Sequence, residues 1–402
     1  MPTGPSLVGT DLVLDVGPIA HGGHCVARAA GQVVFVRHAL PGERVRARVT
    51  EGGAQDRYLR ADAVEVLAPS PHRVESPCRH AGPGGCGGCD LQHVALGEQR
   101  VLKARVVAEA LHRHAGLDWP VSVEALPGHS DGLDWRTRMT FAVDEQGRIG
   151  LRAHRSRQVV EIDRCPIADP RIDVDAIPAA ARPRGGTVRV VATGAGALVA
   201  PPGAAGPPTT MLEPVDTGAW SGQYRVDVGG FWQAHPGAAA TYVARLLADL
   251  APRPGERAVD LYAGVGLFAV PLARAVGPTG TVHAVEGDPG AAANARTNLA
   301  AYPWAEVEHA PVESALARLD RADLVVLDPT RRGAGRAVVT GVCALGARAV
   351  LYVACDPVAL ARDLAYARAQ GYALSRLAAY DAFPMTHHVE CLALLEPADS
   401  TQ

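Results

Sequence analysis

Several features common in other proteins are scarce in this sequence, and each absence narrows the possible function. No run approaches the roughly 18 apolar residues that a membrane helix needs, although 48% of the residues are hydrophobic. The first residues, MPTGPSLVGTDLVLD, lack the basic and apolar regions of a secretory signal. We therefore expect a cytoplasmic protein without membrane attachment, a compartment in which structural disulfides are rare.

Lysine and net charge are also low. Lys103 is the single lysine among 39 basic residues, and the formal net charge is −3. The overall charge therefore gives no sign of a nucleic-acid partner, and only local clusters of arginine could indicate one. No fixed-period repeat is visible, and 402 residues are enough for two or three domains.

The hydrophobic patterns predict a multidomain chain with four regions. The first has short alternating strands and Gly turns, typical of a small β-barrel of the OB kind. The second is rich in Pro, Gly and Cys, and the third has a helix pattern at 97–114 followed by a central β-rich α+β domain. In the fourth, apolar strands alternate with helical segments, as in a parallel Rossmann-like α/β sheet. The predicted boundaries are 1–67, 68–93, 94–230 and 231–402, with an exposed loop at PPGAAGPP (201–208).

A glycine loop opens the fourth region. In AVDLYAGVGLFAVPLARA (258–275), Gly264 and Gly266 allow a tight turn where a ligand approaches the end of a strand. The next strand ends in Glu286, 26 residues after Asp260, where a carboxylate can accept hydrogen bonds from ribose hydroxyls. This pattern is typical of S-adenosylmethionine sites, and another nucleotide-binding α/β domain is the alternative.

Two residues near the C-terminus are candidates for chemistry. Cys355 ends the apolar strand in LYVACDPVALARDL, directly before a Pro-containing helix start. We expect the helix dipole to favour its thiolate, although a core cysteine is the alternative. Glu390 stands at the entry of the final apolar strand in YDAFPMTHHVECLALLEP, where it is a candidate general base or an ordinary exposed carboxylate.

Three further cysteines lie close together in ESPCRHAGPGGCGGCDLQH. Cys78, Cys86 and Cys89 supply three thiolates, and a metal site needs a fourth ligand. His80, His93 and Cys165 are the candidates for it. Four thiolates suit either a [4Fe–4S] cluster or zinc, and unliganded thiols are the alternative. We interpret the remaining cysteines as core residues: Cys25, Cys343 and Cys391.

A local cluster of arginine could contact RNA. Six arginines lie between Arg136 and Arg157, with Asp144 and Glu145 as the opposing charges. Arginine pairs with phosphates and stacks on bases, whereas a solvated strand face is the alternative. Aromatic residues that could stack on a displaced base are Trp135, Phe231, Trp232 and Phe383. The predicted RNA contacts are Arg136, Arg138, Arg152 and Arg155.

Taken in order, these motifs resemble those of the RNA (uracil-C5) methyltransferase family. The matching segments are CGGC, FWQAH, DLYAGVG, VEGD, LDPTRRG, YVACDP and DAFPMTHHVE. The resemblance covers nearly the whole chain and implies an N-terminal TRAM-like barrel, an iron–sulfur-bearing segment and a C-terminal methyltransferase domain.

The resemblance also implies roles for individual residues. Cys355 would be the nucleophile that adds to uracil C6, and Glu390 the base that removes the C5 proton. The fourth ligand of a [4Fe–4S] cluster would be Cys165, in its CPI setting. Contacts to S-adenosylmethionine would come from Gln233, Tyr262, Glu286 and Asp328, together with Gly264 and Gly266 of the loop. The implied substrate is RNA, with rRNA favoured over tRNA, and the expected state is a monomer.

The sequence departs from the family pattern in several places, and two alternatives stay open. Asp356 follows the candidate nucleophile where the family usually has Asn, and Leu267 stands where Asn is common. An Asn common after the third strand has no clear counterpart near HAPVES, and the first gap of the cysteine cluster is longer than the family's. A methyltransferase acting on DNA or a small molecule is one alternative. The other is a non-catalytic RNA-binding protein with a vestigial methyltransferase domain.

Overall fold

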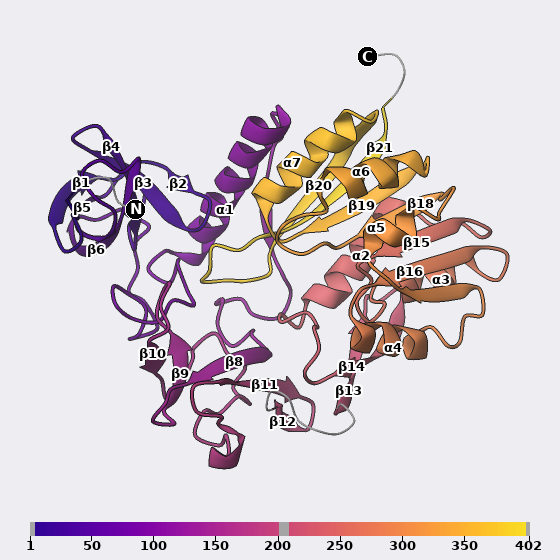
Figure 1. Cartoon of the computed structure of the whole chain (residues 1–402), viewed down its shortest axis with the longest axis horizontal. Coiled ribbons are helices and arrows are strands. Elements are labelled where there is room, and N and C mark those ends of the chain that lie inside the picture. Colours follow the sequence, from indigo (N-terminus) through magenta and orange to yellow (C-terminus); the bar gives the residue numbers. More distant parts are fainter. Residues whose placement is uncertain (1–4, 201–208, 399–402) are drawn as a thin grey trace. The chain divides into compact units, whose positions relative to one another are not determined.

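The computed structural model describes residues 5–200 and 209–398, and the chain forms two compact units (Figure 1). The loop predicted at 201–208 lies outside the described residues. Among the residues that are described, no helix is both long and apolar enough to span a membrane. The units are assembled from separate segments. Unit 1 comprises Met1–Val106, His129–Pro202 and Phe383–His388, and unit 2 comprises Val107–Gly128, Gly203–Ala382 and Val389–Gln402.

Unit 1 begins with a six-stranded sheet in the order β1-β5-β6-β4-β3-β2. Alternate side chains of β5 are buried, including Val45, Ala47 and Val49, because successive residues of a strand point to opposite faces. The sheet curls so that β1 packs beside β3 around one apolar core, which confirms the predicted small β domain (Figure 1). The strands are β1 Asp11–Asp15, β2 Ile19–Ala20, β3 His24–Ala29, β4 Gln32–Arg37, β5 Arg44–Glu51 and β6 Tyr58–Ala68.

The middle of the chain adds an antiparallel sheet to unit 1, in the order β10-β9-β8-β11-β12. Met139 and Phe141 of β8 and Val188 and Val190 of β11 form its core. This confirms the predicted central β-rich region. Its elements are β8 Arg138–Val143, β9 Ile149–Arg152, β10 Val159–Glu161, a 3-10 turn at Ala179–Ala181, β11 Thr187–Thr193 and β12 Gly196–Ala200.

The segment Phe383–His388 also belongs to unit 1, where residues of the cysteine region and helix α1 (Leu96–Ala110) hold it. The carbonyl of Met385 accepts hydrogen bonds from the amides of Asp90 (3.1 Å) and Leu91 (3.0 Å). The single lysine, Lys103, is buried and donates to the carbonyl of Phe383 at 3.1 Å. The residues directly before Glu390 in the chain are therefore fixed by hydrogen bonds within unit 1.

Unit 2 is built on an eight-stranded sheet in the order β17-β16-β15-β18-β19-β21-β20-β7. Strands β15 to β19 run parallel to one another, and β21 is antiparallel to both β19 and β20. A separate hairpin is formed by β13 (Thr210–Asp216) and β14 (Ser221–Asp227). The sheet strands are β7 Val123–Ala125, β15 Arg257–Leu261, β16 Thr281–Glu286, β17 Ala305–His309, β18 Leu324–Leu327, β19 Ala349–Ala354, β20 Tyr372–Asp381 and β21 Glu390–Pro397.

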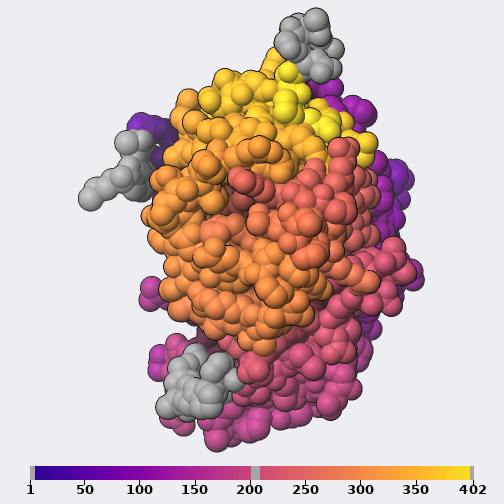
Figure 2. All heavy atoms as spheres, turned by 90° about the vertical axis from the view of Figure 1, so that its right-hand side faces the viewer, coloured from indigo at the N-terminus to yellow at the C-terminus, as the bar shows by residue number. Residues whose placement is uncertain are grey.

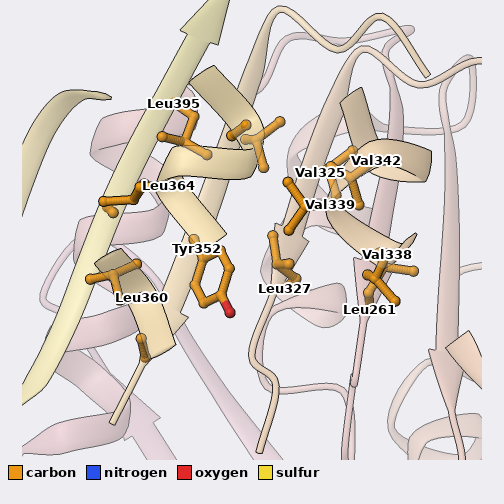
Figure 3. Packing of buried hydrophobic residues seen from close by; sticks show 14 of the residues in the cluster. Leu261, Val325, Leu327, Val338, Val339, Val342, Tyr352, Leu360, Leu364 and Leu395 are labelled. Carbon is orange, nitrogen blue, oxygen red and sulfur yellow. The ribbon is translucent and has the colours of Figure 1, made fainter. Parts of the chain in front are cut away.

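Helices cover both faces of this sheet, which confirms the Rossmann-like prediction. Helices α5 to α7 pack on one face with Leu261, Leu327 and Tyr352 (Figure 3), whereas α2 packs on β19 and β21 and α3 on β15 and β16. Residues of unit 2, coloured orange in Figure 2, form much of the surface seen there. The helical elements are a π turn at Leu111–Ala115, α2 Ala238–Leu250, α3 Ala269–Val276, α4 Pro289–Asn298, α5 Val312–Leu316, α6 Gly335–Ala344 and α7 Pro357–Arg368.

The strand order places a ligand crevice at a defined point of the sheet. The chain leaves β15 toward β16 on one side, and later returns to add β18 on the other side. Ligands of open α/β sheets bind at the carboxyl ends of the strands where the order reverses in this way. The carboxyl ends of β15, β16, β18 and β19 are therefore where a cofactor and its substrate are expected to meet.

Candidate active site

Cys355 and Glu390 occupy equivalent places on neighbouring strands. Strands β19 and β21 are antiparallel, and Ala354 pairs with Cys391 at the end of their ladder. Cys355 follows Ala354, and Glu390 precedes Cys391, so the two candidates continue this ladder by one step. Side chains at opposed positions of an antiparallel pair lie on the same face. The register thus brings together two side chains that are 35 residues apart in sequence.

Burial and neighbouring charges raise the pKa of both Cys355 and Glu390. Glu390 is only 5% exposed, which excludes the interpretation of an ordinary exposed carboxylate. Its pKa is raised well above the usual range by burial and by the charge of Asp328, and Arg331 opposes the shift. The pKa of the half-buried Cys355 thiol is raised to about 12 by burial and by the charges of Glu390 and Asp328. Burial and these charges thus oppose the thiolate-favouring effect that we expected of the helix.

Helix α7 begins directly after Cys355, as predicted. Asp356 is its N-cap, and its Oδ1 accepts hydrogen bonds from the amides of Val358 (3.0 Å) and Ala359 (2.9 Å). Asp and Asn cap helices about equally well, so the departure from Asn at this position costs the helix start little.

Arg331 is a member of this site that the sequence reasoning missed. It lies in the loop after β18 and is exposed, and its positive charge lowers the pKa of both Cys355 and Glu390. The two arginines of LDPTRRG were the available signal. Nothing in the sequence, however, showed which of them approaches the cysteine and the glutamate.

The glycine loop after β15 has the backbone conformation that its sequence requires. Tyr262, Gly264 and Gly266 have positive φ angles of 61°, 56° and 89°. Such a conformation is strained for tyrosine and easily adopted by glycine. The Glu286 carboxylate at the end of β16 accepts hydrogen bonds from the amides of Gly264 and Asp288, each at 2.7 Å. Glu286 therefore shapes the loop directly, in addition to being a candidate ribose contact.

Three groups near this loop, two buried and one half-buried, were not singled out as contacts from the sequence. Asp260 is fully buried, and its pKa is raised well above the usual range by burial and by the charge of Asp328. The Tyr224 hydroxyl donates to the Leu267 carbonyl at 2.9 Å, and Asn298 Nδ2 donates to the Val265 carbonyl at 2.9 Å. Leu267 thus contributes its backbone carbonyl as a hydrogen-bond acceptor, and any residue at this position would supply the same group. Tyr224 and Asn298 lie far from the loop in sequence and carry no local signal.

The FWQAH segment contains one exposed side chain, and His235 is one of its three buried side chains. Phe231 is 73% exposed, whereas Trp232 and Gln233 are buried. The Trp232 ring packs 5.3 Å from the Tyr224 ring. Trp232 is thus a core residue, and Trp135 is as well, at 1% exposure. Of the four aromatic residues suggested for stacking, Phe231 is exposed and Phe383 is half-buried.

The cysteines predicted to hold a metal centre line one pocket of unit 1. Cys78, Cys86, Cys89 and Cys165 surround it, together with His80 and Arg136. Burial is the main cause that raises the pKa of the thiols of Cys86, Cys89 and Cys165, and their neighbouring sulfurs add to it. Over residues 5–200 and 209–398, no group of three or more His, Cys, Asp or Glu side chains has the arrangement of a metal-ion site.

Close contacts explain why glycine occurs at several positions of this segment, and hydrogen-bond donors lie near its sulfurs. A Cβ on Gly85 would lie 2.2 Å from the His80 carbonyl oxygen, and one on Gly87 would lie 2.6 Å from the His154 Cα. The Gly88 amide donates to the Cys86 sulfur at 3.4 Å, and the Gln92 side chain hydrogen-bonds Cys89. Hydrogen-bond donors of this kind stabilise thiolates in iron–sulfur proteins. In this segment such donors reach the sulfurs of Cys86 and Cys89.

The four arginines predicted to bind RNA lie in different environments. Arg152 and Arg155 are exposed, and Arg155 forms an ion pair with Glu51 at 3.1 Å. Arg136 and Arg138 are half-buried, and Arg136 Nε donates to the Arg138 carbonyl at 3.2 Å. The two exposed arginines are the ones that can meet a phosphate without rearrangement.

Two protein families match separate parts of the chain. The TRAM domain family matches residues 5–64, the region of the curled sheet. The family described as tRNA (Uracil-5-)-methyltransferase matches residues 315–398, which contain Asp328, Cys355 and Glu390.

Relatives match over almost the full length. An uncharacterized RNA methyltransferase of Streptomyces coelicolor is 49% identical, over 98% of this chain and 94% of its own length. The 23S rRNA (uracil(1939)-C(5))-methyltransferase RlmD of Pseudomonas aeruginosa is 34% identical, over 98% and 96%. Among solved structures, the Pyrococcus abyssi tRNA (uracil-54, C5)-methyltransferase with S-adenosyl-L-homocysteine has the same fold. It matches with a TM-score of 0.69 and 21% identity, and covers 95% of this chain and 99% of that chain.

Proposed function

The chain belongs to the RNA (uracil-C5) methyltransferase family, and on this premise we propose that it methylates C5 of a specific uridine in RNA through a covalent bond to Cys355. The observation that carries the proposal is the juxtaposition of Cys355 and Glu390 at the paired ends of β19 and β21. S-adenosylmethionine supplies the electrophilic methyl group when it is bound.

Cys355 acts as the nucleophile in this proposal. Uracil C5 is a poor nucleophile, and addition of the thiolate to C6 converts the ring to an enolate whose C5 can attack a methyl group. The target uridine must leave its stack so that the thiolate and the methyl donor can reach the ring. A thiol with a pKa of about 12 in the free site has to lose its proton on binding, for which the nearby Arg331 provides the favourable charge.

Glu390 acts as the base that completes the reaction. Once C5 carries the methyl group, its proton has to be removed before the sulfur can leave C6. A carboxylate with a raised pKa holds an abstracted proton well, which suits it to this step. Removal of the proton restores the C5–C6 double bond and releases the Cys355 thiolate for the next turnover.

The residues at the carboxyl ends of β15, β16 and β18 form the proposed cofactor site. The support is the glycine loop, with its positive φ angles, at the point where the strand order reverses. Glu286 would accept hydrogen bonds from the ribose, and the carboxyl groups of buried Asp260 and half-buried Asp328 would attract the positive charge of the cofactor. The proposed contacts are Gln233, Tyr262, Gly264, Gly266, Glu286 and Asp328.

The proposed substrate is ribosomal RNA, because the named relatives that match over the full length include 23S rRNA enzymes, and tRNA is the alternative. Arg136, Arg138, Arg152 and Arg155 are proposed to contact its backbone. The proposal includes a cytoplasmic, monomeric enzyme. A [4Fe–4S] cluster held by Cys78, Cys86, Cys89 and Cys165 would position unit 1 residues, because methyl transfer needs no electron.

The proposed function is tested with RNA that contains 5-fluorouridine. Fluorine cannot leave as a cation, so a methylating enzyme stays bonded to the base through its cysteine. We expect the wild-type protein and S-adenosylmethionine to give an adduct stable in denaturing gels, and Cys355→Ala to give none. An adduct on Cys355→Ala would overturn the assignment of the nucleophile. Labelling total unmodified RNA and mapping the methylated nucleotide then identifies the substrate, and labelling of DNA instead of RNA would exclude the proposal.

A further inference from the structure

The carboxyl group of Asp363, a buried residue of α7, accepts hydrogen bonds from the loop that follows Asp328. No role has been assigned to Asp363 above. Asp363 is 1% exposed. Its Oδ2 accepts hydrogen bonds from the amides of Ala334 (2.7 Å) and Gly335 (3.0 Å) and from the hydroxyl of Tyr352 (2.7 Å). Three donors on one buried carboxylate oxygen hold the end of this loop, and hydrogen bonds to an ionised group are stronger than neutral ones.

Two neighbours complete the attachment. The Tyr352 hydroxyl also accepts a hydrogen bond from the Ala334 amide at 2.9 Å, and in Figure 3 it points away from Leu364 and Leu395. Arg362 Nε donates to Asp363 Oδ1 at 3.0 Å, and Arg362 Nη2 donates to the Arg332 carbonyl at 2.6 Å. The loop is therefore held at residues 332, 334 and 335 by β19 and α7.

The loop backbone lies directly against the carboxyl group. A Cβ on Gly333 would lie 2.5 Å from Asp363 Oδ2 and 2.7 Å from Arg362 Nη2, and the φ of Gly333 is +76°. Only glycine fits such an approach without displacement of the loop. The sequence TRRGAG thus combines exposed arginines with the one residue type that allows the loop to dock on Asp363.

The anchored loop leaves the end of β18, which runs parallel to β19 with Leu327 opposite Tyr352, so Arg331 and Cys355 follow the same ends of neighbouring strands. The charge of Arg331 favours the ionised forms of Cys355 and Glu390. Arg331 itself is exposed, so its position depends on the backbone that bears it. We propose that Asp363, together with Tyr352, is a positioning residue that holds the Pro329–Gly335 loop and so places the Arg331 guanidinium beside the reacting pair. The expected effect on methylation rests on the proposed function, whereas the expected effect on the reactivity of the Cys355 thiol does not.

The first experiment measures the thiol without RNA or cofactor. Alkylation of Cys355 by iodoacetamide is followed between pH 8 and 10 by mass spectrometry of the peptide that contains it. Asp363→Ala should release the loop, move Arg331 away and lower the rate at fixed pH by about 3- to 10-fold, because one pKa unit changes the thiolate fraction tenfold. Asp363→Asn keeps an acceptor for the two amides and should restore most of the rate.

A double-mutant cycle separates positioning from a general loss of structure. Arg331→Gln should lower the alkylation rate by a similar factor, and Asp363→Ala in that background should lower it no further. Asp249→Ala is the matched control, because Asp249 is a buried carboxylate of the same unit that pairs with Arg245 and Arg376 instead of the loop. It should lower the melting temperature and leave the alkylation rate of Cys355 unchanged.

Activity gives the second readout. Loss of the Arg331 charge raises the pKa of Glu390, so the acid limb of kcat/KM in Asp363→Ala should move to higher pH, and Asp363→Asn should move it back. If Asp363→Ala does not fold, Tyr352→Phe carries the test, because it keeps the ring and removes two of the hydrogen bonds. Wild-type alkylation in folded Asp363→Ala or Tyr352→Phe, or an equal loss in Asp249→Ala, would overturn the inference. A protein that shows the alkylation effect but methylates no RNA would instead refute the proposed function alone.

Discussion

The protein places cysteines in two contrasting environments, one in each unit. In unit 1, Cys86, Cys89 and Cys165 share a pocket with Cys78, where amide and side-chain donors approach the sulfurs. In unit 2, Cys355 lies beside Glu390 and Asp328, whose charges oppose its ionisation, and Cys391 is near it as well. Burial raises the pKa of the thiols in both environments, so the two environments differ in what else surrounds the sulfur. We interpret the pocket cysteines as candidate ligands and Cys355 as the candidate nucleophile.

The largest expected effect comes from replacing Cys355 with serine, and the same replacement at Cys165 provides the comparison between the two environments. Cys355→Ser should lower methylation of RNA by at least about 10³-fold, because a serine hydroxyl is rarely ionised and adds poorly to uracil C6. The same change at Cys165 should leave the adduct with 5-fluorouridine RNA intact. Methylation assays and denaturing gels measure both. Equal losses in the two variants would break the distinction between the environments.

Glu390→Gln is expected to slow the methylation of RNA and at the same time to make the Cys355 thiol more reactive. Without the base, methylation should fall by about 10²- to 10⁴-fold, and the methylated adduct should accumulate on Cys355. Alkylation of Cys355 at pH 9–10 should become faster, because the negative charge that raises the thiol pKa is gone. A slower alkylation would show that Glu390 does not act on the thiol as described.

The same substitution has a stability consequence with a defined sign. Burial raises the pKa of Glu390 above its unfolded value, so the folded protein binds this proton more tightly than the unfolded chain. Stability is therefore highest below the ordinary pKa of glutamate and falls as pH rises toward the folded pKa. At pH 8, Glu390→Gln should raise the free energy of unfolding by about 1–2 kcal/mol, measured by denaturant titration. No gain at pH 8 would contradict the burial argument.

Cys165→Ser should affect the cysteine pocket and little else in catalysis. We expect loss of bound iron and of visible absorbance in anaerobically purified protein, with methylation reduced less than about tenfold because no step needs an electron. Cys343→Ser, a half-buried cysteine outside the pocket, is the control and should keep full iron. Full iron content in Cys165→Ser would show that the fourth ligand is a different residue.

The smallest effect is expected at Tyr242 of α2. The Tyr242 hydroxyl is fully buried and has no hydrogen-bond partner within residues 5–200 and 209–398, and Glu390 and Asp328 add to burial in raising its pKa well above the usual range. Tyr242→Phe removes a buried polar group and should raise the free energy of unfolding by about 0.5–1 kcal/mol. A loss of stability would indicate that the hydroxyl has a partner in solution.

Much of the architecture could be predicted because it depends on local patterns. Alternation of apolar residues predicted the strands of the N-terminal sheet, and the strand–glycine–helix order from Val259 to Ala273 predicted the cofactor loop. The exposure of the aromatic candidates could not be predicted, because it depends on residues that are far away in the sequence. Trp135 and Trp232 are core residues, and a single sequence does not distinguish a buried tryptophan from an exposed one. The domain boundaries, the residue roles and the iron–sulfur cluster remain predictions.

The sequence by itself determined the family, the alternation of strands and helices in the methyltransferase unit and the residue types available for the chemistry, since these follow from motifs and periodicity. Only the tertiary structure decided what surrounds those residues. It paired Cys355 with Glu390 through strand register, brought Arg331 to both of them, and tied the Arg331 loop to Asp363. Electrostatic effects and hydrogen bonds act over a few ångströms in space, and residues 30 or more positions apart can be that close only once the sheet has formed.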